Sequence, residues 1–498
     1  MNRLRTILYL AVSFLLFGCQ ESALEFPKAD VVIVQVNDIY EIDGVNQGKE
    51  GNLARVQGLV DSLKKIYPQV ILVHAGDFLN PSLIGNLKEE NGEKVKGKHM
   101  VQVMNSMSFD AVAFGNHEID LTYPILQKRL NEMQFDMISA NLFFKDSLEI
   151  RAFRQNDKVI GGYKNFEIST KSGPRTLSLL SVILPYNQKD YVHYQNVDST
   201  IQSSINALNE KSDGIFLLSH LNRSEDNELG EKFQKINLIM GGHDHYNFCD
   251  TLGSERYLTK ADANARTAWI HYVSWNDNSK EFLSSPVLID INNEIKKNIE
   301  VEKVIEKWKQ FAAKKTTEQG YNMTNVLMEI DRPLDAREES IRSQQTDFGK
   351  LVCEAMAAAF DTADVVVLNS GSVRYDDLVL NPVTEGDVLK ALPFGGGIKG
   401  AYVNGADLMK IYEAGKLNEG SGGYLQILQI PKGISEFGMY FLVTSSYVSA
   451  GREKNLGFMK DFEWEEPKGL VEGENDIRKI LIDYLSNSTT NEGDKIAM

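Results

Sequence analysis

The sequence predicts two large α/β domains in one chain. The protein has 498 residues, of which 42% are hydrophobic, whereas a single hydrophobic core stops growing at roughly 250–300 residues. From Asp30 to about Asn292, short apolar runs alternate with segments of helical apolar spacing, which is typical of a layered α/β domain. A second α/β pattern runs from about Val326 to the end. We therefore expect two cores, each built around its own sheet.

The first eighteen residues have the features of an export signal. Arg3 and Arg5 precede an apolar run from Ile7 to Phe17, which is too short to span a bilayer comfortably and indicates a signal peptide over residues 1–18. The segment Leu16-Phe17-Gly18-Cys19 resembles the bacterial lipobox. That resemblance implies cleavage before Cys19, lipidation of its thiol, and a lipid-anchored tether over residues 19–29. An ordinary secretory signal with an accidental cysteine is the alternative.

The amino-acid composition restricts the binding partners of the protein, and the residue after Cys19 indicates the membrane to which it is exported. The formal net charge of −16 argues against a nucleic acid polymer as partner. A phosphate ester bound by such a chain needs metal ions or a few arginines to meet its charge locally. We expect an exported, membrane-anchored bacterial lipoprotein, facing the periplasm or the cell surface. Gln20, in place of Asp, favours the outer membrane in a Gram-negative host.

Two cysteines remain after Cys19. Cys249 and Cys353 fall in different predicted domains, so the sequence does not indicate a disulfide framework. We expect two buried free thiols.

Each predicted strand of the first domain ends in a polar cluster. The strands are expected at Val31–Val36, Val70–His74, Ala111–Phe114, Ile215–Leu218 and Leu238–Met240, and helices at Leu53–Ile66 and Met100–Met107. Sites in open α/β sheets lie beyond the carboxyl ends of strands. The polar clusters are therefore expected to meet in space.

A helix over Glu294–Lys315 is predicted to link the domains, within a connecting segment 294–325. Its apolar stripe contains Val301, Val304, Ile305, Trp308 and Phe311. In the second domain, a helix is expected at Asp347–Phe360 and a strand at Val365–Leu368. The polar residues Ser486–Met498 are expected to fray.

The five polar clusters contain potential metal ligands. They are Asn37-Asp38-Ile39-Tyr40, Gly76-Asp77, Gly115-Asn116-His117-Glu118-Ile119-Asp120, Ser219-His220 and Gly241-Gly242-His243-Asp244-His245, and they hold four of the eight histidines. Mixed oxygen and nitrogen donors suit two metal ions. Asp77 can bridge both ions with its two oxygens, while Asn116 offers a neutral oxygen.

The order of these clusters resembles the calcineurin-like metallophosphoesterase superfamily. More closely, it resembles the bacterial 5′-nucleotidase and 2′,3′-cyclic phosphodiesterase family, over about residues 30–460, and the segments GNHEID and GGHDH are the most specific. The resemblance implies a layered αββα metallophosphoesterase sandwich over residues 30–293. A smaller mixed α/β domain of the 5′-nucleotidase C-terminal type, over residues 326–498, would bind the substrate, with the active site between the two.

The resemblance also implies two divalent metal ions, drawn from Mn, Zn, Mg, Co and Fe. The implied ligands of one ion are Asp38, Asp77 and His245, and those of the other are Asp77, Asn116, His220 and His243. His117 is implied to face the phosphoryl group without binding metal, and Asp120 to orient its ring.

One position departs from the family pattern. Where the family has D-x-H, this chain has Asp38-Ile39-Tyr40. A neutral phenol, with a reference pKa of about 10, is a weak ligand, although a strongly acidic metal can bind phenolate. Tyr40 either binds metal or fills space while water completes the coordination. Asp262 and Asn264, farther along, either orient metal ligands from behind or serve as caps.

Two segments of the second half extend the resemblance. Residues Leu368–Arg374 resemble the family's L-N-G-G-G-I-R, and Leu392–Gly396 its L-P-F-G-G. The implied substrate contacts are Arg342, Asn369 and Arg374, with a base held between Phe394 and Tyr447. After Tyr447, however, residues 451–457 read GREKNLG where the family has G-G-D-G, so the substrate wall differs.

The implied reaction is hydrolysis of a phosphomonoester, with nucleoside 5′-monophosphates as leading substrates and a hydroxide between the ions as nucleophile. Cyclic nucleotides, UDP-sugars and sugar phosphates stay open on the same scaffold. A lipoprotein that binds a ligand without turning it over is the alternative from another class, favoured by Tyr40 and the altered 451–457 segment.

Overall fold

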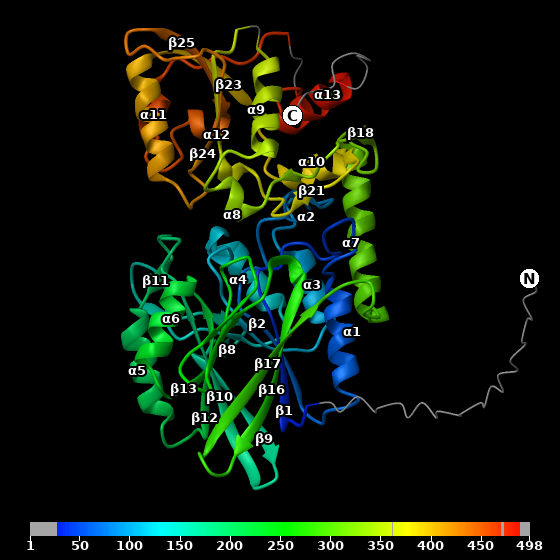
Figure 1. The fold of residues 1–498 in the computed structure, drawn as a ribbon, viewed down its shortest axis with the longest axis vertical. Coiled ribbons are helices and arrows are strands. Elements are labelled where there is room, and N and C mark those ends of the chain that lie inside the picture. Colours follow the sequence, from blue (N-terminus) through cyan, green and yellow to red (C-terminus); the bar gives the residue numbers. More distant parts are fainter. Residues whose placement is uncertain (1–26, 361, 470–472, 489–498) are drawn as a thin grey trace, which may run out of the picture.

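The computed structural model describes residues 27–360, 362–469 and 473–488, which form two lobes stacked along the long axis of the molecule (Figure 1). The predicted signal peptide and Cys19 lie outside the described residues. Within them, none of the helices is long and apolar enough to cross a membrane.

The N-terminal lobe contains two six-stranded sheets. The first has the order β17-β16-β1-β2-β3-β4 and the second β14-β15-β13-β12-β10-β9. The strands of the first are β1 (Val31–Val36), β2 (Val70–His74), β3 (Phe109–Ala113), β4 (Met137–Ile138), β16 (Thr267–Asn276) and β17 (Glu281–Asp290). Those of the second are β9 (Tyr163–Thr170), β10 (Gly173–Ile183), β12 (Gly214–His220), β13 (Ile236–Gly241), β14 (Phe248–Thr251) and β15 (Tyr257–Lys260).

Alternate side chains of β1 show how the two sheets are covered. Val31 and Ile33 pack into the core between the sheets, whereas Val32 and Val34 pack into the core under the outer helices. A strand buried on both faces is mostly apolar, as β1 is. Its one polar residue, Gln35, is buried with Nε2 donating to the carbonyls of Gly241 and Thr259 at 3.0 Å each.

Helices cover the outer faces of both sheets and complete the predicted αββα layering. On the first sheet lie α1 (Leu53–Leu63), α3 (Lys98–Asn105), α4 (Tyr123–Glu132) and α7 (Ile299–Glu318); on the second lie α5 (Val197–Leu208) and α6 (Arg223–Lys232). Smaller elements are α2 (Leu83–Asn86), β5 (Leu142–Lys145), β6 (Ile150–Ala152), β7 (Arg154–Gln155), β8 (Lys158–Val159) and β11 (Val192–Tyr194).

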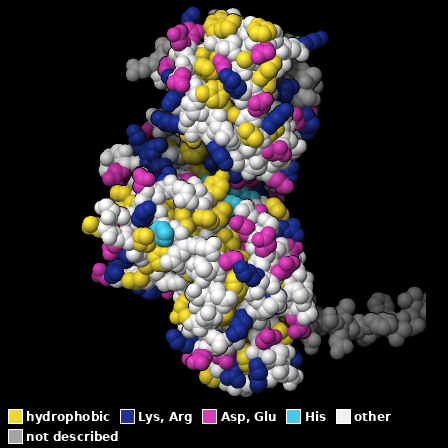
Figure 2. Space-filling view, turned by 90° about the vertical axis from the view of Figure 1, so that its left-hand side faces the viewer, with side chains coloured by type: hydrophobic (Ala, Val, Ile, Leu, Met, Phe, Trp, Pro, Cys, Tyr) yellow, Lys and Arg dark blue, Asp and Glu magenta, His cyan; other side chains and the backbone are white. Residues whose placement is uncertain are grey.

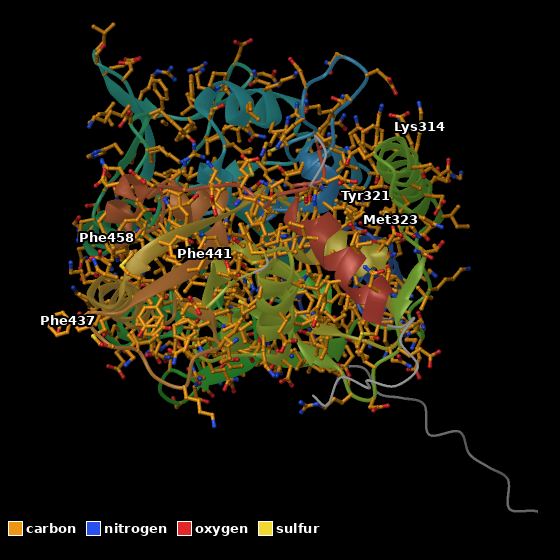
Figure 3. The ribbon with its side chains drawn as sticks, turned by 90° about the horizontal axis from the view of Figure 1, so that it is seen from above. Lys314, Tyr321, Met323, Phe437, Phe441 and Phe458 are labelled. Atoms are coloured by element: carbon orange, nitrogen blue, oxygen red, sulfur yellow. The ribbon has the colours of Figure 1, made fainter. Side chains whose placement is uncertain are left out.

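The predicted connecting helix, α7, belongs to the N-terminal core as well as joining the lobes. It begins at Ile299 rather than Glu294, because the Asn298 side chain caps the backbone N–H groups of Glu300 and Val301. The predicted apolar stripe packs on α1 and α3. Viewed from above, Lys314 near its end lies at one side of the molecule and Phe437 at the other (Figure 3).

The C-terminal lobe is smaller and has a four-stranded sheet of order β23-β25-β20-β24 between helices. Its strands are β20 (Val365–Asn369), β23 (Ile398–Asn404), β24 (Leu425–Gln429) and β25 (Met439–Ser445). Val366 and Leu368 face one core with α9 (Asp347–Ala358), α10 (Glu385–Ala391) and α13 (Ile477–Ser488). Val365 and Val367 face the other core with α11 (Gly405–Leu417) and α12 (Ser446–Ser449). Short elements are α8 (Glu338–Ile341), β18 (Val326–Met328), β19 (Leu334–Asp335), β21 (Leu378–Val379) and β22 (Val383–Thr384).

Two local expectations are wrong. Cys353 is buried as predicted, but Cys249 is exposed, because it lies on the outward face of the edge strand β14. Both thiols are free, as expected. Helix α13 continues to Ser488, so fraying does not begin at Ser486; residues 489–498 lie outside the described part.

Candidate active site

The predicted metal ligands meet at the carboxyl ends of the strands that precede them. Asp38, Asp77 and Asn116 follow the parallel strands β1, β2 and β3 of the first sheet. His220 ends β12 and His243 follows β13, its parallel neighbour in the second sheet. Two facing sheets thus bring donors from distant parts of the sequence together.

One group of donor atoms is formed by the side chains of Asp38 and His245, with Tyr40 and Asp77 beside them. The Nε2 atom of His245 lies 3.5 Å from Asp38 Oδ1. The Tyr40 hydroxyl lies 3.4 Å from His245 Nε2 and 3.2 Å from Asp77 Oδ2. Tyr40 therefore points into the donor group.

A second group is centred on Asn116. Its Oδ1 atom lies 3.2 Å from His220 Nε2 and 3.0 Å from His243 Nδ1, and Asp77 Oδ2 lies 3.3 Å from His220 Nε2. Asp77 Oδ2 is thus common to both groups. Its other oxygen, Oδ1, accepts the backbone N–H of His117 at 2.7 Å, so one carboxylate oxygen faces both groups rather than one oxygen each.

These donors fit a metal ion. Ligand atoms about 2.0–2.2 Å from one ion and at right angles to each other lie about 3 Å apart, close to the spacings within each group. The ligand atoms of Asp38, Asp77 and His220 all lie within 4.8 Å of one another. Asp38 Oδ1 is buried without a hydrogen-bond partner, which is costly for a carboxylate unless a cation faces it.

Three of these residues adopt a strained backbone. Asp38, Asp77 and His243 have φ angles of 51°, 64° and 81°, in the left-handed region, which costs on the order of 1–3 kcal/mol for a non-glycine residue. Asp38 Oδ2 compensates in part by accepting the His243 N–H at 2.9 Å. In each of the three residues the strain falls where the chain turns into the donor group after its strand.

Glu118, which sequence reasoning left without a role, holds two of the ligand loops together. Its carboxylate accepts the backbone N–H groups of Asp77, Phe78, Leu79 and Gly115 at 2.7–3.0 Å. Burial raises the pKa of Glu118, and Asp77 adds to this, while the N–H donors oppose it. Four donors on two oxygens match the ionised carboxylate. The position of Glu118 inside the GNHEID segment was the feature of the sequence that could have indicated this role.

His117 and Asp120 form the predicted pair. His117 Nδ1 lies 2.7 Å from Asp120 Oδ2, and the side chains of Asn80 and Asn187 donate to Asp120 at 3.0 and 2.9 Å. Burial lowers the pKa of His117, but Asp77 and Asp120 outweigh it, so the net shift is upward. Asn187 was missed because it follows β10, a strand the sequence did not reveal.

Asn264 positions the loop that carries Asp38. Its side-chain oxygen accepts the N–H groups of Tyr40 and Glu41 at 3.0 and 3.2 Å, and its own N–H donates to the Asp38 carbonyl at 2.8 Å. Asp262 instead pairs with Arg266. Asn264 therefore supports the loop of a candidate metal ligand, which is one of the two roles that the sequence left open for these residues.

A cavity of about 820 Å³ lies between the lobes next to the donors. Figure 2 shows a hollow at the waist of the molecule in which hydrophobic and histidine side chains are visible. The cavity is lined from the N-terminal lobe by Asp77, Asn116, His117, Asp120, His243 and His245, and from the C-terminal lobe by all five predicted substrate residues, Arg342, Asn369, Arg374, Phe394 and Tyr447. Asp38 and His220 are fully buried behind this wall.

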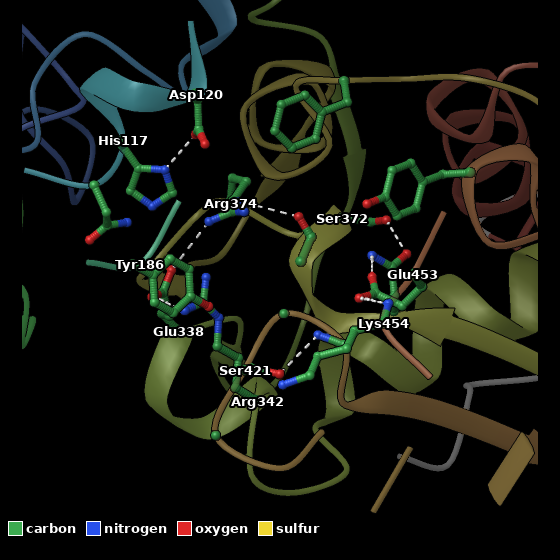
Figure 4. A pocket seen from close by; sticks show the side chains of 18 of the residues that line it. His117, Asp120, Tyr186, Glu338, Arg342, Ser372, Arg374, Ser421, Glu453 and Lys454 are labelled. Atoms are coloured by element: carbon green, nitrogen blue, oxygen red, sulfur yellow. Dashed lines mark hydrogen bonds and ion pairs between the residues drawn. The ribbon is translucent and has the colours of Figure 1, made fainter. Parts of the chain in front are cut away.

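Glu338 holds the two arginines and was not predicted. Its carboxylate pairs with Arg342 and lies 3.6 Å from Arg374 Nη1. Burial would raise the pKa of Glu338, but Arg342, His245 and Arg374 together bring it below its usual range. In Figure 4, Arg374 lies between Asp120 above it and Glu338 and Arg342 below it.

The far end of the cavity is aromatic and polar. The rings of Phe394 and Tyr447 are 47% and 44% exposed, so neither is simply core. Asn369 Nδ2 donates to Glu453 Oε2 at 3.0 Å. Glu453 belongs to the altered 451–457 segment, which therefore forms part of the cavity wall.

Contacts between the lobes reach a donor directly. Asp376 Oδ2 lies 2.6 Å from His245 Nδ1, and its Oδ1 accepts the Glu338 N–H at 2.8 Å. Arg266 donates to the Asp376 carbonyl at 2.7 Å. Nothing in the sequence around Asp376 indicated this contact.

Two family comparisons match the two lobes. Residues 31–247 match the calcineurin-like phosphoesterase family and residues 323–453 the 5′-nucleotidase C-terminal domain; together they cover more than half of the chain. Bovine (Bos taurus) 5′-nucleotidase is 23% identical over 420 residues, covering 76% of this chain and 69% of that protein.

Solved structures share the whole fold. A 5′-nucleotidase precursor from Thermus thermophilus aligns with a TM-score of 0.72 at 18% identity, covering 92% of this chain and 96% of that one. The sulfate thiohydrolase SoxB of the same organism aligns with a TM-score of 0.66 at 14% identity, covering 93% and 95%. A metallophosphoesterase lobe with clustered metal donors, followed by a 5′-nucleotidase C-terminal lobe, shows that the chain belongs to the 5′-nucleotidase family of metal-dependent phosphoric ester hydrolases.

Proposed function

We propose that the protein hydrolyses nucleoside 5′-monophosphates with two divalent metal ions in the cleft between its lobes. The observation that carries this proposal is the position of Asp77 Oδ2, which lies within 3.3 Å of donors from both groups, Tyr40 in one and His220 in the other. A carboxylate oxygen shared by both groups can bridge two adjacent ions.

The donor groups divide naturally between two ions. Asp38, Asp77 and His245 would hold one, and Asp77, Asn116, His220 and His243 the other. Two bound ions would lower the pKa of a water nucleophile and neutralise charge on the phosphoryl oxygens. The ions are drawn from Mn, Zn, Mg, Co and Fe.

His117 is the proposed acid and electrostatic partner of the reacting phosphate. Asp120 accepts a hydrogen bond from Nδ1 of His117, which leaves Nε2 of the same ring free to face the substrate. The upward shift in the pKa of His117 favours the protonated ring, which can share its proton with the leaving oxygen. Arg342 and Arg374, fixed by Glu338, supply further positive charge in the same cavity.

The aromatic end favours a nucleoside over other leaving groups. Two half-exposed rings in one cavity, Phe394 and Tyr447, suit the two faces of a base. The Glu453 carboxylate can accept hydrogen bonds from sugar hydroxyls. Cyclic nucleotides, UDP-sugars and sugar phosphates fit the same chemistry and are the competing substrates.

Two substrates separate a base-binding site from simple packing. Phe394→Ala or Tyr447→Ala should weaken nucleotide use by roughly 1–3 kcal/mol, mainly in KM, because stacking far from phosphorus acts alike on ground and transition states. Hydrolysis of p-nitrophenyl phosphate, which has no base, should barely change. Equal losses on both substrates would mean that the rings are packing elements.

We also propose that Cys19 anchors the protein to a membrane as an exported lipoprotein, on the strength of the Leu16–Cys19 segment. The wild type should sediment with membranes and Cys19→Ser should not; co-sedimentation of both would refute lipid anchoring.

A further inference from the structure

The ion site formed by Asp38, Asp77 and His245 contains a fourth donor. The Tyr40 hydroxyl lies 3.2 Å from Asp77 Oδ2 and 3.4 Å from His245 Nε2, spacings that neighbouring ligands of one ion have. Asp38 Oδ1 completes the group, 3.5 Å from His245 Nε2 and without a hydrogen-bond partner. The hydroxyl donates a hydrogen bond to Asp77 Oδ2, so its oxygen is held facing the other donors.

The backbone fixes the tyrosine in this place. The Tyr40 N–H donates to Asn264 Oδ1 at 3.0 Å, and the preceding Asp38 is held in its left-handed conformation by the same loop. The ring stands edge-on to His117, with centroids 5.9 Å apart and planes at 85°. Tyr40 is thus locked between the proposed acid and His245.

The charges of the two donor groups differ sharply. Asp38, Asp77 and a ligating Tyr40 would bring three negative charges to the first ion, together with one imidazole. The second group adds to Asp77 only neutral donors: one amide, from Asn116, and the imidazoles of His220 and His243. Oxygen-rich anionic groups favour hard ions of high charge, whereas imidazoles suit borderline divalent ions.

We propose that the phenol oxygen of Tyr40 is a ligand of the first ion and that this site takes a hard trivalent cation, of which Fe³⁺ is the natural example, beside a divalent ion at the second. This inference rests on the proposed two-ion site. Binding exchanges the phenol O–H bond for an oxygen–metal bond and releases one proton to solvent. Tyrosinate is an established ligand of ferric iron.

Visible absorption tests the proposal without relying on activity. The full chain is stripped of metal by chelation and reloaded with Zn²⁺ and with Fe³⁺ from its citrate complex. Phenolate bound to Fe³⁺ gives a visible charge-transfer band, and resonance Raman excitation in that band enhances the phenolate ring modes. We expect the band in the wild type and its loss in Tyr40→Phe. Iron binding should weaken by at least roughly 10–100-fold, the loss caused by removing a hydrogen-bond partner of a metal ligand.

Tyr186→Phe is the matched control, since that ring lies 6.4 Å from His243 on the side of the second group and should leave the band intact. Tyr40→His provides a second variant that retains a ligand: it should keep bound iron but lose the band. Equal melting temperatures show that the variants fold. Iron bound by the wild type without a phenolate band, or with unchanged affinity in Tyr40→Phe, would overturn the proposal.

Phosphatase assays distinguish this failure from failure of the proposed function. Hydrolysis of p-nitrophenyl phosphate by a protein that lacks the band would refute Tyr40 ligation and leave the enzyme assignment intact. A band in a protein that hydrolyses no phosphate ester would support Tyr40 as a ligand and refute the catalytic proposal.

Discussion

At the residue scale, His117 can be tested separately from metal binding. Its Nδ1 atom faces Asp120 at 2.7 Å, and its contact with the Asp77 carboxylate is made by the backbone N–H. Its ring is therefore available to the substrate, whereas the ligand loop does not depend on it.

His117→Ala should lower kcat by about 10²–10⁴-fold, the usual scale for general acid–base groups, with bound metal unchanged. The measurements are kcat with p-nitrophenyl phosphate and metal content after gel filtration. His193→Ala, on the outlying strand β11, serves as control. Loss of metal from His117→Ala would place the imidazole among the ligands and contradict its assigned role.

At the element scale, burial on both faces decided which strands could be predicted. The runs at β1 and β2 are apolar except for Gln35 and His74, and their predicted bounds matched the structure residue for residue. The long pair β16 and β17 was missed because exposed and polar side chains interrupt it, including a proline at 286. The candidate donor positions were predictable because each lies at the end of a buried strand or within a few residues of it.

A buried histidine in β16 makes the sandwich sensitive to acid. His271 is fully buried between the sheets, with Nε2 3.1 Å from Gln35 Oε1 of β1. Burial lowers the pKa of His271 from 6.5 to about 3. The folded form therefore keeps His271 neutral, and its stability contribution, complete above pH 6.5, is lost as pH falls from 6.5 towards 3.

Between pH 7 and pH 5 this group should cost about 2 kcal/mol of unfolding free energy, because each pH unit below 6.5 costs about 1.4 kcal/mol. His271→Gln keeps polar atoms at the site but cannot titrate, so its loss over the same interval should be smaller by that amount. Urea unfolding of both proteins at the two pH values is the measurement. Equal losses would show that His271 does not couple folding to pH here.

At the scale of the whole molecule, the site exists only where the lobes meet. The motifs of each half were predictable because they follow strands within that half. Glu338 and Asp376 were not, since their contacts with Arg374 and His245 are made by residues distant in sequence. Only the folded arrangement decides which acidic residue of one lobe faces which histidine of the other.

The same arrangement divides the proposed tasks of the site between the lobes. The metal donors come from the N-terminal lobe, while the arginines, the exposed rings and the altered 451–457 segment come from the C-terminal one. Changes in the second lobe can redirect specificity without disturbing the donors.

Phosphate release by chelator-treated protein tests the proposed metal-dependent hydrolysis most directly. It is measured before and after addition of Mn²⁺, Zn²⁺, Mg²⁺, Co²⁺ or iron. The substrates are nucleoside 5′-monophosphates, cyclic nucleotides, UDP-sugars, sugar phosphates and p-nitrophenyl phosphate. The account predicts little release from the stripped protein, and recovery on metal addition with the highest kcat/KM for a nucleoside 5′-monophosphate. Release that is unaffected by chelation, or metal-restored activity confined to substrates without a base, would contradict it.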